Sequence, residues 1–265
     1  MTRAQMIAMH VLLSPVTAAP AFAQETPAPG SQAETYWDKD EFKASQDALK
    51  KEHGGGTNYM ILADRFEYQS GEGSPALLLE GQGWWGTDEN RLWIKSEIDY
   101  DLDTSSFEES EVQALWSRPI ARYFDLQAGV RHDFEPGPSR TYAVAGIQGL
   151  APYWFEVDGA VFLSEEGDLS ARLEAEYEFL LTQRLVLQPR TELNFAAEDV
   201  PELETGAGLS TAEMGLRLRY EFDRQFAPYV GVNWKASTGE TADFARARGE
   251  DTETLSFVTG IRVWF

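Results

Sequence analysis

The stretch RLEAEYEF, residues 172–179, decides the fold of this chain. Its charged residues take every second position and its apolar residues take the positions between them: Arg172, Glu174, Glu176 and Glu178 against Leu173, Ala175, Tyr177 and Phe179. A helix cannot place side chains in this way, because its repeat is about 3.6 residues whereas that of a strand is about 2. The stretch therefore predicts a β-strand with one polar and one apolar face.

The same two-residue rhythm continues from Tyr59 to the end of the chain. It is plain in RLWIKSEIDY (91–100), LVLQPRTELNF (185–195) and MGLRLRYEF (214–222). Strands that cross an outer membrane need about 9–11 residues. We predict twelve such strands, at 59–68, 76–85, 91–100, 110–118, 122–133, 140–149, 153–163, 169–180, 184–195, 210–222, 226–235 and 254–265.

The connections between these strands alternate in length. Tight ones such as GTDEN (86–90) and LTQ (181–183) alternate with longer, mostly acidic ones such as AAEDVPELETGAGL (196–209). Short periplasmic turns and longer outer loops are typical of outer-membrane barrels. Aromatic pairs beside the turns and the terminal strand IRVWF (261–265) fit the same class. We predict an all-β, transmembrane antiparallel barrel over residues 59–265, with both termini in the periplasm.

The amino-acid composition excludes some other classes of protein. The chain has 44 acidic and 22 basic residues, a net charge of −22, and no cysteine. Nucleic acid is excluded as a partner, because no basic cluster offsets this charge. No apolar run after the first 23 residues reaches the roughly 20 that a membrane helix needs. A β-barrel can nevertheless span the outer membrane and contact its lipid, because only every second residue of each strand faces the lipid.

The N-terminal region differs from the rest. Residues 1–23 carry Arg3, a short apolar core and an Ala21-Phe22-Ala23 ending, which predicts a cleaved signal peptide and export in a Gram-negative cell. Residues 24–58 begin rich in proline and alanine, and we interpret them as a flexible periplasmic segment. A short helix is predicted within this segment at about 37–51, before three glycines.

The polar faces of the strands should enclose a charged lumen. At about twelve strands the interior is modest, so most charges are expected to neutralise one another in cross-strand ladders. A cation path or metal site lined by surplus carboxylates is the functional alternative. Glu174, Glu176 and Glu178 repel one another unless cations separate them, and arginines of neighbouring strands, such as Arg190 and Arg219, could bridge them.

Soft metal ligands are scarce beyond residue 23. Met214 falls on the lipid face, and His132 has the parity of a girdle residue. Cu(I) prefers sulfur, whereas Cu(II) accepts imidazole and carboxylate. The candidate metal ligands are two residues near the barrel entrance and eight carboxylates of the inward faces: His53, Met60, Glu67, Asp99, Asp133, Glu156, Asp158, Glu174, Glu176 and Glu178.

Several long strings resemble the copper resistance protein B family. They include GWWGTDENRLWIKSE (83–97), EVQALWSRPIARYFDLQAGVRHDF (111–134) and ARLEAEYEFLLTQRLVLQPRTELN (171–194), and the resemblance covers Asp64 to Phe265. It implies an outer-membrane barrel of a copper-handling system that binds copper ions or assists their passage. It also implies periplasmic copper-binding proteins or an oxidase of the same system as partners. Many relatives carry a Met/His-rich N-terminal region, but residues 24–58 hold one histidine and no methionine.

Two other functions compete with this hypothesis. A general-diffusion or structural barrel would use its lumen charges only as stabilising ladders. A barrel phospholipase would need a serine activated by a histidine. The one histidine in the predicted strands is His132, and no Ser-Asn-Gly sequence follows it, so we do not expect an enzyme.

Overall fold

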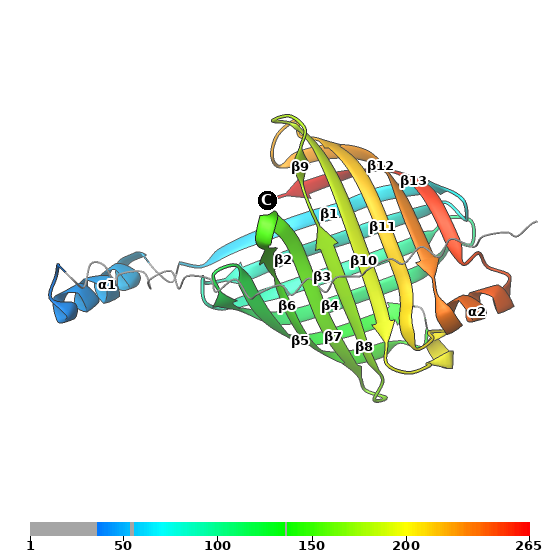
Figure 1. Cartoon of the computed structure of the whole chain (residues 1–265), viewed down its shortest axis with the longest axis horizontal. Helices are drawn as coiled ribbons and strands as arrows, with labels where there is room; N and C mark the ends of the chain where they lie inside the picture. The colour runs from blue at the N-terminus through cyan, green and yellow to red at the C-terminus, as the bar shows by residue number, and fades with distance from the viewer. Residues whose placement is uncertain (1–35, 54–55, 136) are drawn as a thin grey trace, which may run out of the picture. The chain divides into compact units, whose positions relative to one another are not determined.

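The computed structural model describes residues 36–53, 56–135 and 137–265, which fall into two compact units divided between His53 and Gly54. The second unit is a closed sheet of antiparallel strands, drawn in Figure 1. Its strands are β1 (Asn58–Gly71), β2 (Ala76–Gly86), β3 (Arg91–Asp101), β4 (Ser106–Ala121), β5 (Phe124–Glu135), β6 (Arg140–Ala151), β7 (Phe155–Ser164), β8 (Leu169–Glu176), β9 (Phe179–Leu180), β10 (Leu185–Ala196), β11 (Gly208–Tyr220), β12 (Phe226–Ser237) and β13 (Glu253–Trp264).

Apart from β8 and β9, consecutive strands pair with each other, and β13 closes the ring by pairing with β1. β8 and β9 both pair with β10 and together occupy one strand position. The thirteen segments therefore form a barrel of twelve strands, as the sequence predicts. Closure leaves no sheet edge, which a lipid environment requires because it offers backbone groups no water.

The predicted strand 169–180 is interrupted, and Pro189 of β10 gives the reason. The Tyr177 N–H donates to the Pro189 carbonyl at 3.1 Å. Proline has no N–H to return the bond, so the ladder is broken at this point. β8 consequently ends at Glu176, and pairing resumes at Phe179.

One loop differs from the prediction. Residues 236–253 contain the helix α2 (Gly239–Arg248), where we expected an irregular connection. The helix ends at Gly249, whose φ of 82° suits glycine. It is tied to the preceding long loop by a hydrogen bond from the Gly206 N–H to Thr241 Oγ1 (2.8 Å) and by an ion pair between Arg248 and Glu204. In Figure 1, α2 lies at the end of the barrel opposite the C-terminus.

The two ends of the barrel can therefore be distinguished. The connections 87–90, 122–123, 152–154, 181–184 and 221–225 lie at the end where β1 begins and β13 finishes; we call this the turn end. The connection 152–154 is a short 3-10 helix, η2 (Pro152–Trp154). The other connections, including η3 (Pro201–Leu203) and α2, define the loop end.

The first unit contains one described helix, α1 (Lys39–His53), against the predicted range of 37–51. The Asp38 carboxylate caps it, because Oδ1 accepts hydrogen bonds from the backbone N–H groups of Asp40 (2.9 Å) and Glu41 (3.2 Å). Within the described residues, no helix is long and apolar enough to cross a membrane. The predicted signal peptide, 1–23, lies outside the described residues.

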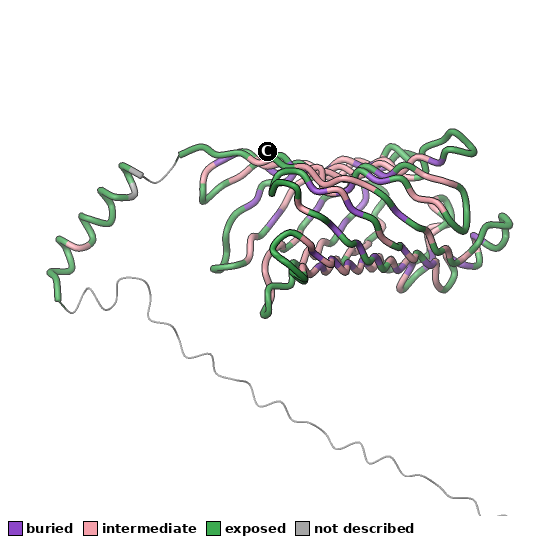
Figure 2. The backbone as a smooth tube through the Cα atoms, turned by 90° about the horizontal axis from the view of Figure 1, so that it is seen from above, coloured by how far each residue is buried: buried purple, intermediate pink, exposed green. Residues whose placement is uncertain are grey.

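Burial alternates along the strands, and buried and exposed positions succeed one another along the tube in Figure 2. Outward side chains such as Met214 (53% exposed), Leu216 and Leu218 are the apolar ones, as predicted. The inward face is not uniformly polar, however. One side of the interior holds an apolar cluster of Trp93, Leu115, Tyr142, Val144 and Phe162. The sequence predicts the charged side chains of the lumen but not this apolar cluster.

Gly260 of β13 provides a test of interior packing. A Cβ at this position would lie 2.6 Å from the Tyr229 ring carbon Cζ and 2.7 Å from the Phe66 carbonyl oxygen. We expect Gly260→Ala to lower the free energy of unfolding by about 1–3 kcal/mol, because crowded interiors accommodate extra methyl groups poorly. The temperature at which the folded, fast-migrating band disappears on a denaturing gel would measure this loss.

Gly159→Ala is the matched control, since no atom lies within 4 Å of its added Cβ. Equal unfolding temperatures for the two variants would contradict the packing argument.

Candidate functional site

Four inward arginines hold the middle of the lumen, and we call Arg65, Arg131, Arg172 and Arg190 the arginine belt. Arg65 of β1 pairs with Glu97 of β3 (3.2 Å) and with Glu213 of β11 (3.1 Å), and also with Glu80 of β2. Arg190 of β10 pairs with Glu213 (3.3 Å) and reaches Glu80 at 3.8 Å. Because Arg65 reaches β3 and β11 and Arg190 reaches β2, the belt connects strands that are not neighbours in the barrel.

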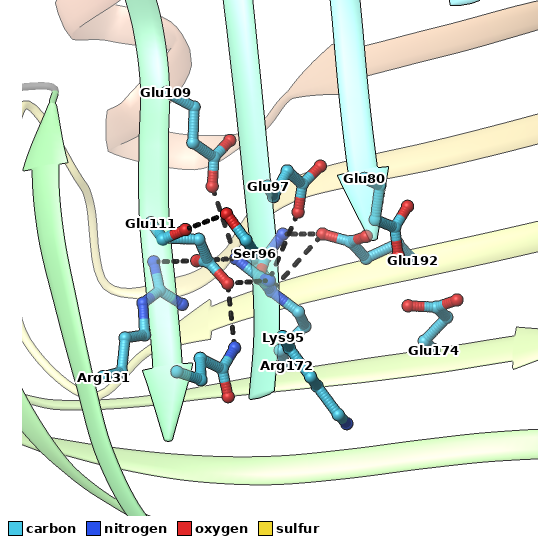
Figure 3. A network of polar contacts seen from close by, with 12 residues as sticks. Glu80, Lys95, Ser96, Glu97, Glu109, Glu111, Arg131, Arg172, Glu174 and Glu192 are labelled. Atoms are coloured by element: carbon cyan, nitrogen blue, oxygen red, sulfur yellow. Dashed lines mark hydrogen bonds and ion pairs between the residues drawn. The ribbon is translucent and has the colours of Figure 1, made fainter. Parts of the chain in front are cut away.

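Arg172 of β8 pairs with four carboxylates on three other strands. Its guanidinium pairs with Glu97 of β3 (3.6 Å), Glu109 (3.4 Å) and Glu111 (3.1 Å) of β4, and Glu192 of β10 (3.5 Å). Figure 3 shows these four carboxylates converging on it from different strands. Arg172 therefore braces one side of the barrel against the other across the interior.

The four guanidinium groups of the belt form ion pairs with more than four carboxylates. Each arginine has five N–H donors and can bind several carboxylates at once. Arg131 illustrates this, because it pairs with Glu111 (2.6 Å) and Asp133 (2.6 Å) while its guanidinium lies 4.8 Å from the centroid of the Phe162 ring. The belt and the apolar cluster thus join into one packed layer inside the barrel.

A second inward pair lies beside the belt, between Glu67 and Arg217. Arg217 Nε and Nη2 donate to the Glu67 carboxylate at 3.0 and 2.9 Å, and Tyr229 Oη donates to it at 3.0 Å. Both charged side chains are at most 3% exposed. Gly215 provides room for the arginine, because a Cβ there would lie 2.1 Å from Arg217 Nη1.

A cavity of about 490 Å³ extends from the belt toward the turn end. Belt partners such as Glu97 and Glu111 line one part of it, and Tyr123 and Leu150 of the turn end line another. Nine acidic residues contribute to its wall, against four basic ones: Asp64, Glu80, Glu97, Glu111, Asp125, Glu156, Asp158, Glu174 and Glu176, against Lys95, Arg122, Arg172 and Arg262. Acidic side chains therefore outnumber basic ones on the described wall. Arginines behind the wall pair with several of them, whereas Glu156 and Glu176 have no such partner among the described residues.

The structure separates the predicted ligands by their surroundings. Glu156, Asp158, Glu174 and Glu176 line the cavity, whereas the other predicted carboxylates and Met60 do not. The Glu67 carboxylate is occupied by its donors, and both oxygens of Asp133 accept hydrogen bonds from Arg131 at 2.6 and 2.8 Å. Asp158 pairs with Lys95. No three His, Cys, Asp or Glu side chains in the described part of the chain are grouped so that they could hold a metal ion.

The glutamate triplet is only partly bridged by arginines. Glu174 binds Arg190 through both oxygens, at 2.9 Å each. Glu178 accepts hydrogen bonds from Arg219 (2.6 Å) and Arg262 (2.8 Å). Glu176, although only 7% exposed, has neither a hydrogen bond nor an ion pair with any described residue.

The remaining candidates and His132 have other surroundings. Met60 is near the start of β1, paired in register with Trp84. His53 is the last residue of α1, and its side chain lies outside what the structure describes. Asp99 on β3 has a buried oxygen, Oδ1, without a hydrogen bond. His132, predicted to be a girdle residue, packs edge-on against Phe134, with ring centroids 4.6 Å apart.

Asp64 is a cavity residue that the two-residue rhythm does not reveal. The register of β1 shifts between Ala63 and Arg65, so a β-bulge places neighbouring residues on the inner side. Asp64 there pairs with Arg262 Nε at 2.7 Å. Two adjacent charges, Asp64 and Arg65, inside a predicted strand are the signal in the sequence that could have indicated the bulge.

A closed antiparallel wall with apolar side chains outside and charges inside defines an outer-membrane β-barrel. The NanC porin has this fold, with a TM-score of 0.50 at 12% identity over 78% of this chain and 99% of that one. The KdgM porin gives a TM-score of 0.49 at 12% identity, over 78% and 99% of the two chains.

The chain belongs to the copper resistance protein B family, since the family described as "Copper resistance protein B precursor (CopB)" matches residues 57–265. The "Copper resistance protein B homolog" of Pseudomonas syringae pv. tomato is 45% identical over 80% of this chain and 72% of its own length. "Copper resistance protein B" of Escherichia coli is 42% identical over 80% and 71%. The chain is thus an outer-membrane barrel involved in copper resistance, and neither the family nor the fold indicates an enzyme.

The span of Arg172 across the lumen leads to a prediction about stability. We expect Arg172→Gln to lower the free energy of unfolding by about 3–5 kcal/mol, because it leaves buried carboxylates of β3, β4 and β10 without their shared cation. Urea unfolding in lipid vesicles, followed by tryptophan fluorescence, measures this loss.

Arg246→Gln is the control, because its ion pair with Asp243 is at the surface, with side chains 63% and 58% exposed. Its loss should be about 0–1 kcal/mol. If both variants unfold at the same urea concentration, the belt does not brace the barrel.

Proposed function

We propose that this barrel binds copper ions in the acidic cavity and assists their passage across the outer membrane. The observation that carries the proposal is the excess of acidic over basic side chains on the cavity wall, within a barrel of a copper resistance family. Clefts with one sign of charge and low-dielectric walls raise the local concentration of counter-ions. Copper ions would therefore accumulate between the turn end and the arginine belt.

The chemistry of the wall favours Cu(II) over Cu(I). Carboxylate oxygens accept Cu(II), whereas Cu(I) prefers thioether and thiolate sulfur. Among the described residues no sulfur lines the cavity, whereas the carboxylates of Glu156, Asp158, Glu174 and Glu176 do. We assign these four the first contact with copper because they line the cavity, and we assign Glu67, Asp133 and Glu178, which do not line it and are bound by arginines, to support of the wall.

The arginine belt argues against general diffusion. A general-diffusion porin keeps an open aqueous path, whereas here ion pairs join β8 to β4 and β10 to β2 through the interior. Passage of an ion would require belt pairs to exchange partners. A cation could promote such an exchange by competing with the guanidinium groups for their carboxylates.

We further propose that the turn end faces the periplasm. Short turns on the periplasmic side and longer loops outside are the usual arrangement of such barrels. Both ends of the barrel chain, and the cavity beside them, would then meet periplasmic copper-binding proteins or an oxidase of the same system.

Copper tolerance tests the functional proposal. We expect deletion of the chain to lower the copper concentration that halves growth by at least twofold, and re-expression to restore it. Growth in nickel serves as the control for a general envelope defect. Unchanged growth in copper after deletion would contradict the proposal.

The absence of cysteine allows a test of orientation. We expect Asp243→Cys, on exposed α2, to react in intact cells with a maleimide that cannot cross the outer membrane. Asp88→Cys, in the exposed turn between β2 and β3, should react only after the outer membrane is permeabilised. The reverse pattern would show that the turn end faces outward.

A further inference from the structure

Glu156 and Glu176 face each other at the end of a ladder. They are cross-strand partners and form the last pair between β7 and β8 at the turn end. Side chains directly opposite on one face have Cβ atoms about 4.5–5.5 Å apart, and two like charges in that position are destabilising. Both side chains line the cavity. Either a proton on one carboxylate or a cation between the two would relieve this repulsion.

No described residue supplies such a cation directly. The partner of Glu176 across β10 is Arg190, but the guanidinium of Arg190 is bound by Glu174, Glu192 and Glu213. Arg262, on the same side of the cavity, pairs with Asp64 (2.7 Å) and Glu178 (2.8 Å). Neither Glu156 nor Glu176 forms a hydrogen bond or ion pair with the rest of the described chain.

The burial of Glu176 makes this arrangement costly. Its side chain is 7% exposed, and an ionised carboxylate removed from water without a partner is strongly unfavourable. The neighbouring carboxylates of the triplet avoid this cost through arginines, but Glu176 does not. A buried, unpartnered carboxylate that lines a cavity beside a second free carboxylate points to an exchangeable cation.

We propose that Glu156 and Glu176 hold a divalent cation whose remaining ligands are water, at the turn end of the cavity. As an assignment of the site at which Cu(II) binds, this rests on the proposed function. As a site for divalent cations that prefer oxygen ligands, it stands on the geometry alone.

Two carboxylates, rather than three or more, suit such a role. Conduction requires a site that is favourable enough to enter and weak enough to leave. A cation that keeps most of its water on one or two carboxylates exchanges readily. An oxygen-only site also excludes tight binding of soft monovalent ions.

Titration of the purified full chain in detergent with Mn²⁺, followed by electron paramagnetic resonance, tests the site. Mn²⁺ is the probe because carboxylate and water ligands suit it. We expect saturable binding by the wild type and at least a tenfold loss of affinity in both Glu156→Gln and Glu176→Gln. Glutamine keeps the shape and removes one of two repelling charges, so both variants should fold.

Glu166→Gln is the matched control, since it removes one carboxylate from the exposed loop between β7 and β8 and should bind like the wild type. Wild-type affinity in Glu176→Gln, or no saturable Mn²⁺ binding by the wild type, would overturn the site. Cu²⁺ should compete with Mn²⁺ for it, and Ag⁺ should not. Competition by Ag⁺ alone would overturn the preference for oxygen-seeking cations.

The two proposals can fail separately. If Mn²⁺ binding depends on Glu156 and Glu176 but deletion of the chain leaves copper tolerance unchanged, the site stands and the proposed function fails. If tolerance depends on the chain but the variants bind Mn²⁺ as the wild type does, the site fails and the function stands.

Discussion

The closed backbone ladder is the constraint on which the rest of this structure depends. Lipid offers no hydrogen bonds to the backbone, so every strand must be paired on both sides, and β13 must return to β1. Once the wall closes, every inward side chain is confined in a narrow interior with its neighbours. Charges that would be independent on an open sheet must then find partners across the lumen.

The arginine belt is the result of that confinement. Arg172 and Arg190 pair with carboxylates on strands that are several positions away around the barrel. Arginine suits this position because its planar group binds several carboxylates at once and stays charged when buried. Removing a belt arginine or one of its carboxylates would leave buried charges uncompensated. The same network that stabilises the barrel therefore also crosses its lumen.

Acidic side chains without basic partners lie between the belt and the turn end. The guanidinium groups are used by the carboxylates in the middle of the lumen, so the cavity beside them keeps acidic side chains without arginine partners. Pro189 adds to this, because the ladder stops directly after Glu176. The proposed cation site lies in this part of the interior.

The sequence by itself determined the wall. A rhythm of two residues fixes which side of each strand meets lipid, and turn lengths fix the antiparallel order, because both depend only on local chemistry. Tertiary structure alone decided which charges meet: that Glu174 and Glu178 are bridged while Glu176 is not, and that a bulge brings Asp64 inside. Those outcomes depend on strand register and barrel closure, which bring together residues far apart in the chain. A local sequence pattern carries no information about such long-range contacts.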